Sequence, residues 1–90
     1  MAKLIKVNGE IEEVSPKNGT SFELEELQKM VGGLIQILAT DENLLFVMNE
    51  EGKVLGLPAN HKATEIFQKE FKTSDFLVGN VLICNDNEIE

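Results

Sequence analysis

The sequence predicts a single α+β domain in which two helices pack on a mostly antiparallel sheet. Three observations indicate this fold class. Most apolar and β-branched runs are short and are separated by turn residues, as strands are, whereas two segments repeat their apolar residues at helical spacing. The chain has 90 residues, of which 42% are hydrophobic, so it can build one modest core over residues 1–90. The expected element order is β-β-α-β-β-β-α-β.

The first two strands are expected at 3–7 and 10–14. Asn8 and Gly9 lie between them, and this pair favours a two-residue hairpin turn because both residues tolerate positive φ angles. Pro16 ends the second strand, since proline cannot donate a hydrogen bond to a neighbouring strand.

A first helix is expected at 21–31, where apolar residues recur at near-helical spacing. Thr20 and Glu23 have the spacing of a capping box at its start. Gly32 and Gly33 offer a left-handed end.

A three-stranded meander is expected next. The runs "LIQILAT" and "NLLFVMNE" predict two strands, and Asp41-Glu42-Asn43 predicts the turn between them. The segment "EEGK" predicts a further turn into a short strand at 53–57.

The second helix is expected to begin after Asn60, its natural N-cap. Ala63, Ile66, Phe67 and Phe71 then fall on one side of the helix. The stretch "DFLVGNVLICN" predicts a last strand with a bulge or a close backbone approach at Gly79, and residues 85–90 predict an acidic tail.

The charge of the chain limits its partners. The net charge is −8 and all eight positive residues are lysine, which disfavours nucleic acid and anionic membrane as partners. The longest apolar run, Leu44 to Met48, is too short to span a bilayer, and the N-terminus has no apolar signal region. We therefore expect a cytoplasmic protein.

Groups that could perform catalysis are few. The chain has one histidine, His61, and one cysteine, Cys84, too few for a structural zinc site within one chain. Neither residue lies in a nucleophile motif, and Cys84 follows "NVLI", where a small core residue is the simpler interpretation. We expect no enzyme activity, no metal and no cofactor.

The loop before the second helix is the best candidate for a ligand site. A helix start presents unpaired N–H groups and a positive dipole end, and here His61 and Lys62 replace the acids that usually occupy the first turn. The alternative is a plain connection in which Leu57 and Pro58 pack on the core and His61 is solvated. The candidate ligand-binding residues are Lys53, Gly56, Leu57, Pro58, Asn60, His61, Lys62 and Thr64.

The sequence also resembles a known family. The segments "IEEVSPKNGTSFELEELQKMVGG", "NEEGKVLGLPANHKAT" and "FLVGNVLI" are similar to the small phage- and plasmid-borne proteins grouped as domain of unknown function 3846. The likeness runs from about Leu4 to Cys84 and is most specific at 31–33 and 56–64. It implies a protein of a mobile element acting in a bacterial cell, and no assigned activity accompanies it.

Two functions are therefore expected. The first is a non-enzymatic, homo-oligomeric binding protein that antagonises a host defence function by sequestering a small anionic, nucleotide-like signal. The second is an acidic interaction protein that mimics nucleic acid or blocks a basic protein of the host defence, with no small-molecule ligand. Its acidic surface would comprise Glu10, Glu12, Glu13, Glu23 and Glu26.

Overall fold

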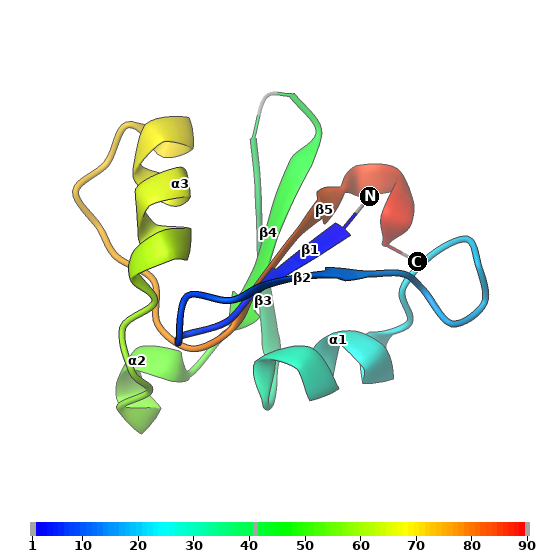
Figure 1. Cartoon of the computed structure of the whole chain (residues 1–90), viewed down its shortest axis with the longest axis horizontal. Helices are drawn as coiled ribbons and strands as arrows, with labels where there is room; N and C mark the ends of the chain where they lie inside the picture. Colours follow the sequence, from blue (N-terminus) through cyan, green and yellow to red (C-terminus); the bar gives the residue numbers. More distant parts are fainter. Residues whose placement is uncertain (1, 41, 90) are drawn as a thin grey trace.

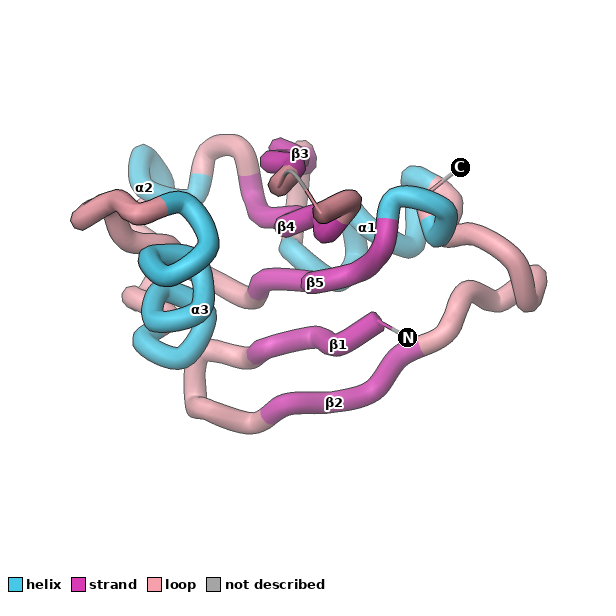
Figure 2. Tube along the Cα trace, turned by 90° about the horizontal axis from the view of Figure 1, so that it is seen from above, coloured by secondary structure: helices cyan, strands magenta, loops and turns pink. Residues whose placement is uncertain are grey.

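A five-stranded sheet, in which all four pairs of neighbouring strands are antiparallel, forms the centre of the computed structural model, which describes residues 2–40 and 42–89. The strand order is β2-β1-β5-β4-β3, so the first and last strands lie side by side and β2 and β3 form the edges (Figure 2). The strands are β1 (Ala2–Ile5), β2 (Ile11–Val14), β3 (Ile35–Ala39), β4 (Leu44–Asn49) and β5 (Val81–Asn85).

The two longer helices cover opposite faces of this sheet (Figure 1). Helix α1 (Leu24–Val31) packs on a cluster that contains Leu4, Val47 and Leu82, and helix α3 (His61–Phe71) packs on one that contains Ile5, Phe46 and Val81. Because successive residues of a strand point to opposite faces, neighbouring residues of β1, β4 and β5 enter different clusters. The α+β class predicted from the sequence is confirmed.

Three phenylalanine rings fill the core beneath α3. The ring of Phe46 meets those of Phe67 and Phe71 edge-on, with centroid separations of 5.7 Å in both cases. Edge-on aromatic pairs contribute about 0.5–1.5 kcal/mol each beyond their buried area. These contacts fix α3 against β4.

The first hairpin differs from the two-residue turn predicted for it. The N–H of Lys6 donates to the carbonyl of Glu10 over 2.9 Å, and that of Gly9 donates to the carbonyl of Lys6 over 2.9 Å, so three residues form the loop. Gly9 takes a φ of 94°, whereas Asn8 uses its side chain to accept the N–H of Glu10. The side-chain amide of Asn8 stabilises this three-residue loop. The two-residue turn predicted at Asn8 and Gly9 is therefore wrong.

Helix α1 starts later than the sequence predicted. Its N-cap is Glu23, which forms a capping box with Glu26, so the box predicted between Thr20 and Glu23 is wrong. The reason is a long-range contact: Phe22 is extended, because it bridges to Ile89 near the other end of the chain. A residue held in an extended bridge cannot belong to a helix. The predicted end at Gly32 is confirmed by its left-handed φ of 82°.

The predicted strand at 53–57 is wrong, because this segment forms the one-turn helix α2 (Gly52–Leu55). The side chain of Asn49 accepts the N–H of Glu51 over 2.8 Å and turns the chain out of the sheet. Gly56 then ends the turn with a left-handed φ of 72°. The meander therefore has two strands, and the observed order is β-β-α-β-β-α-α-β.

The last part of the chain is more closely packed than expected. Strand β5 begins at Val81 instead of near residue 75, and Asn85 leads into a 3₁₀ helix (Asp86–Glu88). The half-buried Ile89 packs against the α1 cluster, so the described part of the expected acidic tail is folded onto the domain. Of the turn predicted at 41–43, Asp41 lies outside the described residues, and Asn43 has a left-handed φ of 65°.

Candidate functional site

Asn60 is the N-cap of α3, as predicted, and is completely buried. Its Oδ1 accepts the N–H of Ala63 over 3.0 Å. Its Nδ2 donates to the carbonyls of Ile5 over 2.9 Å and Gly79 over 2.8 Å. These contacts join the start of α3 to the last residue of β1 and to the loop that leads into β5. The amide of Asn60 therefore has a structural role and does not face a ligand.

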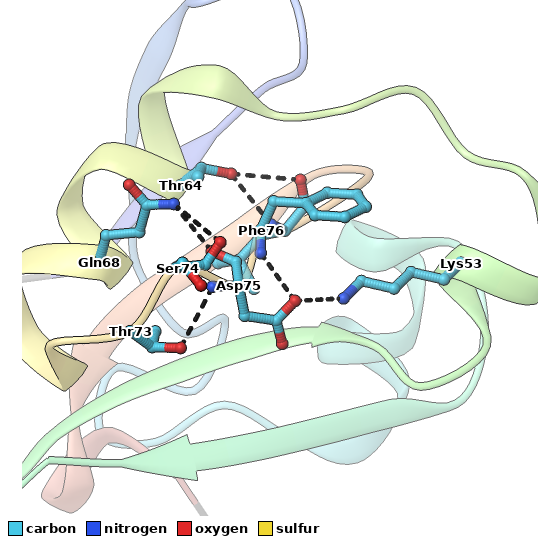
Figure 3. Close-up of polar contacts among 8 residues, drawn as sticks. Lys53, Thr64, Gln68, Thr73, Ser74, Asp75 and Phe76 are labelled. Atoms are coloured by element: carbon cyan, nitrogen blue, oxygen red, sulfur yellow. Dashed lines mark hydrogen bonds and ion pairs between the residues drawn. The ribbon is translucent and has the colours of Figure 1, made fainter.

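Thr64 is also engaged within the protein. Its Oγ1 accepts the N–H of Leu77 over 2.9 Å, while the carbonyl of Leu77 accepts the N–H of Asn60 over 2.9 Å. One turn further along α3, Gln68 donates to the carbonyl of Asp75 over 3.0 Å (Figure 3). The polar side chains of α3 thus hold the segment between α3 and β5 alongside the helix.

Lys53, on α2, is paired with an acid of that same segment. Its Nζ donates to Oδ1 of Asp75 over 2.7 Å and lies 4.4 Å from the centre of the Phe76 ring (Figure 3). The hydrogen bond from Lys53, together with one from the N–H of Phe76, holds the pKa of Asp75 below its ordinary value. A lysine that already has a carboxylate partner offers less positive charge to a ligand.

The connection between α2 and α3 packs partly on the protein. Leu57 is half-buried against Gly79, and the carbonyl of Pro58 accepts the N–H of Gly79 over 2.8 Å. Leu57 and Pro58 also line an open pocket of about 250 Å³ beside the end of α1, and Gly32, just after that helix, lines the same pocket. Gly56 is exposed, and a Cβ at its position would meet nothing within 4 Å.

His61 and Lys62 are exposed in the first turn of α3. The residues that the structure describes line three pockets of note: the one beside Leu57, one of about 160 Å³ to which Lys53 contributes, and one of about 340 Å³ beside α1. Neither His61 nor Lys62 lines any of these three pockets. The structure therefore does not assemble the eight predicted residues around one of these cavities.

The sequence reasoning missed the largest of these three pockets. It has a volume of about 340 Å³ and lies between the end of β2 and α1, and we call it the α1 groove. The sequence indicates part of this pocket through "ELEEL", which places three glutamates at the start of one helix. It does not indicate that β2 lies nearby, because that depends on how the strands pair in the sheet. The lining residues are apolar Val14, Phe22 and Met30, acidic Glu23, Glu25 and Glu26, and Ser15, Lys17 and Lys29.

Glu26 has a fixed position in the α1 groove. Its carboxylate accepts the N–H of Glu23 and that of Lys17, each over 2.9 Å. These two hydrogen bonds, that of Glu23 first, lower the pKa of Glu26 below its ordinary value of 4.5. Glu26 thus ties the loop after β2 to the helix start, and leaves Glu23 and Glu25 as the exposed acids of the groove.

Lowering the pH is expected to lower the free energy of unfolding through Glu26. The pKa of Glu26 is lower in the folded state than in the unfolded state. The ionised carboxylate of Glu26 therefore stabilises the folded protein fully above the unfolded-state pKa, and this contribution is lost as the pH falls through the folded-state pKa. Glu26→Gln should therefore lose stability at neutral pH and show a smaller further loss on acidification. Urea unfolding between about pH 7 and about pH 3 measures this. Glu25→Gln is the matched control, and equal pH slopes for the two variants would refute the assignment.

Cys84 and His61 lie on opposite sides of the sheet. Cys84 is buried on the α1 side of the sheet, and its burial, followed by the charge of Glu88, raises the pKa of its thiol to about 12. His61 lies at the start of α3, which covers the other face. Among residues 2–40 and 42–89, no three histidine, cysteine or acidic side chains are grouped to hold a metal ion. None of the described helices is long and apolar enough to cross a membrane.

These features define a small α+β domain with helices on both faces of an antiparallel sheet and a groove beside α1 that is lined by apolar and charged residues. The chain belongs to the family described as a domain of unknown function, DUF3846, whose sequence profile matches residues 3–90. No curated protein and no solved structure matches it. The family resemblance seen in the sequence is thereby confirmed.

Proposed function

We propose that this protein is a non-catalytic binding protein that blocks a basic partner protein by seating a segment of it in the α1 groove. The observation that carries the proposal is the combination of apolar lining residues with three glutamates, against two lysines, in one groove. A lysine or arginine side chain has an apolar stem and a charged end, so it fits both parts of such a groove. In the phage and plasmid setting that the family resemblance implies, the partner would be a host defence protein.

The net charge of −8 supports a basic partner for a second reason. A negative protein attracts a positive one over several ångströms before contact, which raises the rate of association. Glu12 lies on the same face of the sheet as the groove, because it pairs with Leu4 and so points toward α1, whereas Glu13 pairs with Lys3 and points to the other face. The acidic surface expected from the sequence is thus divided between the two faces.

Sequestration of a small anionic signal has weaker support. An anion needs several donors that converge on one place. The amide of Asn60 is used within the fold, and Lys53 already binds Asp75. His61 and Lys62 are the exposed cationic candidates that remain of the predicted set, and they carry this second hypothesis.

The groove is tested with Glu25→Gln, using a short peptide of alternating lysine and leucine as the probe. We expect binding that weakens with salt, and a loss of affinity of about two- to fivefold in the variant, as is usual for an exposed charge pair. Glu13→Gln is the matched control, because it removes a glutamate of β2 from the opposite face. Titration calorimetry gives the affinities, and NMR shifts at Val14, Phe22 and Met30 locate the peptide.

Equal losses in the two variants, or NMR shifts away from the groove, would refute the proposal. The double variant His61→Ala/Lys62→Ala distinguishes the second hypothesis in the same experiment. It should leave peptide binding unchanged. If the protein instead retains a nucleotide in native mass spectrometry and the double variant loses it, sequestration is the better description.

A further inference from the structure

Strand β3 has a free edge that can be described residue by residue. The carbonyl of Leu34 accepts the N–H of Glu50 over 2.8 Å, and the N–H of Thr40 donates to the carbonyl of Leu44 over 2.8 Å, so both ends of the strand bond toward β4. In an antiparallel ladder the bonding direction alternates from one residue to the next. The N–H and C=O groups of the alternate residues, Ile35, Ile37 and Ala39, therefore point away from β4. Figure 2 shows β3 at the outer edge of the sheet.

The side chains of this edge carry no charge. The stretch 34–40 reads "LIQILAT", and Ile37 at its centre is 39% exposed on the α1 face of the sheet. Proteins usually protect an edge strand with charged residues or proline. The other edge, β2, follows that rule, because it carries Glu12 and Glu13. The absence of such protection on β3 indicates an edge that pairs with another strand.

We propose that two copies of this chain pair through β3, antiparallel and about a two-fold axis at Ile37, to form one sheet that is continuous through both copies. In this register Ile37 lies opposite Ile37 of the second copy, and Ile35 lies opposite its Ala39. Each of these pairs exchanges two hydrogen bonds, because the outward groups of one strand meet the outward groups of the other. The strand is thus complementary to itself.

Charge permits a second copy at this edge and opposes one at the other edge. The chain carries a net charge of −8, which opposes contact between most surfaces of two copies. Pairing through β2 would bring the acidic pair Glu12 and Glu13 of each copy together, whereas pairing through 34–40 brings no charged side chains of the two strands opposite each other.

The opposite face of β3 adds an apolar contact. Gln36 and Leu38 line the pocket of about 160 Å³ to which Lys53 contributes, together with Val54, which is 88% exposed. The proposed register sets Leu38 of the second copy beside Gln36, at the mouth of this pocket. There it can cover part of Val54, so the association is not limited to the backbone ladder.

Analytical ultracentrifugation of the purified full chain tests the proposal. The wild type should sediment as a dimer that dissociates on dilution. Ile37→Lys and Ile37→Glu, each alone, should weaken association at least about tenfold, because the register sets two like charges face to face. An equimolar mixture of the two variants should restore the dimer, since Lys then lies opposite Glu.

Ile11→Lys is the matched control, because Ile11 is an exposed isoleucine of the other edge strand, and this variant should remain a dimer. Circular dichroism checks that each variant is folded. A monomeric wild type, a dimer that survives both Ile37 variants, or a mixture that does not reassociate would overturn the proposal. A monomer that captures an added "LIQILAT" peptide at β3 would mean that the edge serves a partner strand instead.

Discussion

Asn60→Ala is expected to lower the free energy of unfolding by about 3–5 kcal/mol, the sum of a lost helix cap and two buried carbonyls without their donor. The carbonyls are those of Ile5 and Gly79, and the cap is the bond from the N–H of Ala63. Asn60 is completely buried, so water cannot replace the missing amide without entering the core. Chemical denaturation followed by circular dichroism measures the change.

Asn60→Asp separates the two contributions. It keeps an oxygen that can cap α3, but directs a carboxylate at two carbonyl oxygens, so we expect it to be at least as destabilising as Asn60→Ala. Asn87→Ala, at an exposed asparagine, is the control and should change the stability by no more than about 0.5 kcal/mol. A loss below about 1 kcal/mol for Asn60→Ala would show that the amide does not hold α3 to the sheet. This is also why His61 and Lys62 are substituted without Asn60 in the ligand test.

Gly79→Ala is expected to destabilise the protein by about 2–4 kcal/mol, from backbone strain together with overpacking. Gly79 has a φ of 72°, and a Cβ there would lie 2.9 Å from Cδ1 of Leu57. Gly56 provides a close control, because it has the same φ of 72° but open space around the missing Cβ. Gly56→Ala should therefore show the strain alone, about 1–2 kcal/mol. Urea midpoints give both values.

The difference between the two glycine variants measures the contact with Leu57. If that contact is responsible, Leu57→Ala should make Gly79→Ala no more harmful than Gly56→Ala, in a double-mutant cycle. Equal losses for Gly79→Ala and Gly56→Ala in the wild-type background would show instead that Leu57 moves aside freely.

Local rules predicted those elements whose cause is local. The predicted N-cap of α3 is confirmed, because Asn60 caps the N–H of a residue only three positions away. The segment 53–57 was assigned to a strand because its short apolar run follows a turn, and such a run can belong to a strand or a helix. The side chain of Asn49, outside this run, turns the chain into α2, and Gly52 then packs so close to Val78 that a Cβ would lie 2.7 Å from its side chain. No pattern within 53–57 records that approach.

The candidate site shows the same limit. The sequence identified the cationic helix start at His61 and Lys62, but not that the amide of Asn60 is bonded to Ile5, 55 positions earlier. The α1 groove depends on β2 lying next to α1, and this follows from the sheet order and not from either segment alone. Side-chain chemistry could be read from the sequence, whereas its availability to a partner required the structure.

The central position of β5 also has a consequence for synthesis. This strand lies between β1 and β4, so the hairpin of β1 and β2 has no partner in the sheet until residues 81–85 have left the ribosome. Until then the two hairpins share no strand, and the backbone edges of β1 and β4 that pair with β5 lack a partner. Strand β5 joins the hairpins in one late step, and a nascent chain that stalls before Val81 would present these edges to chaperones and proteases.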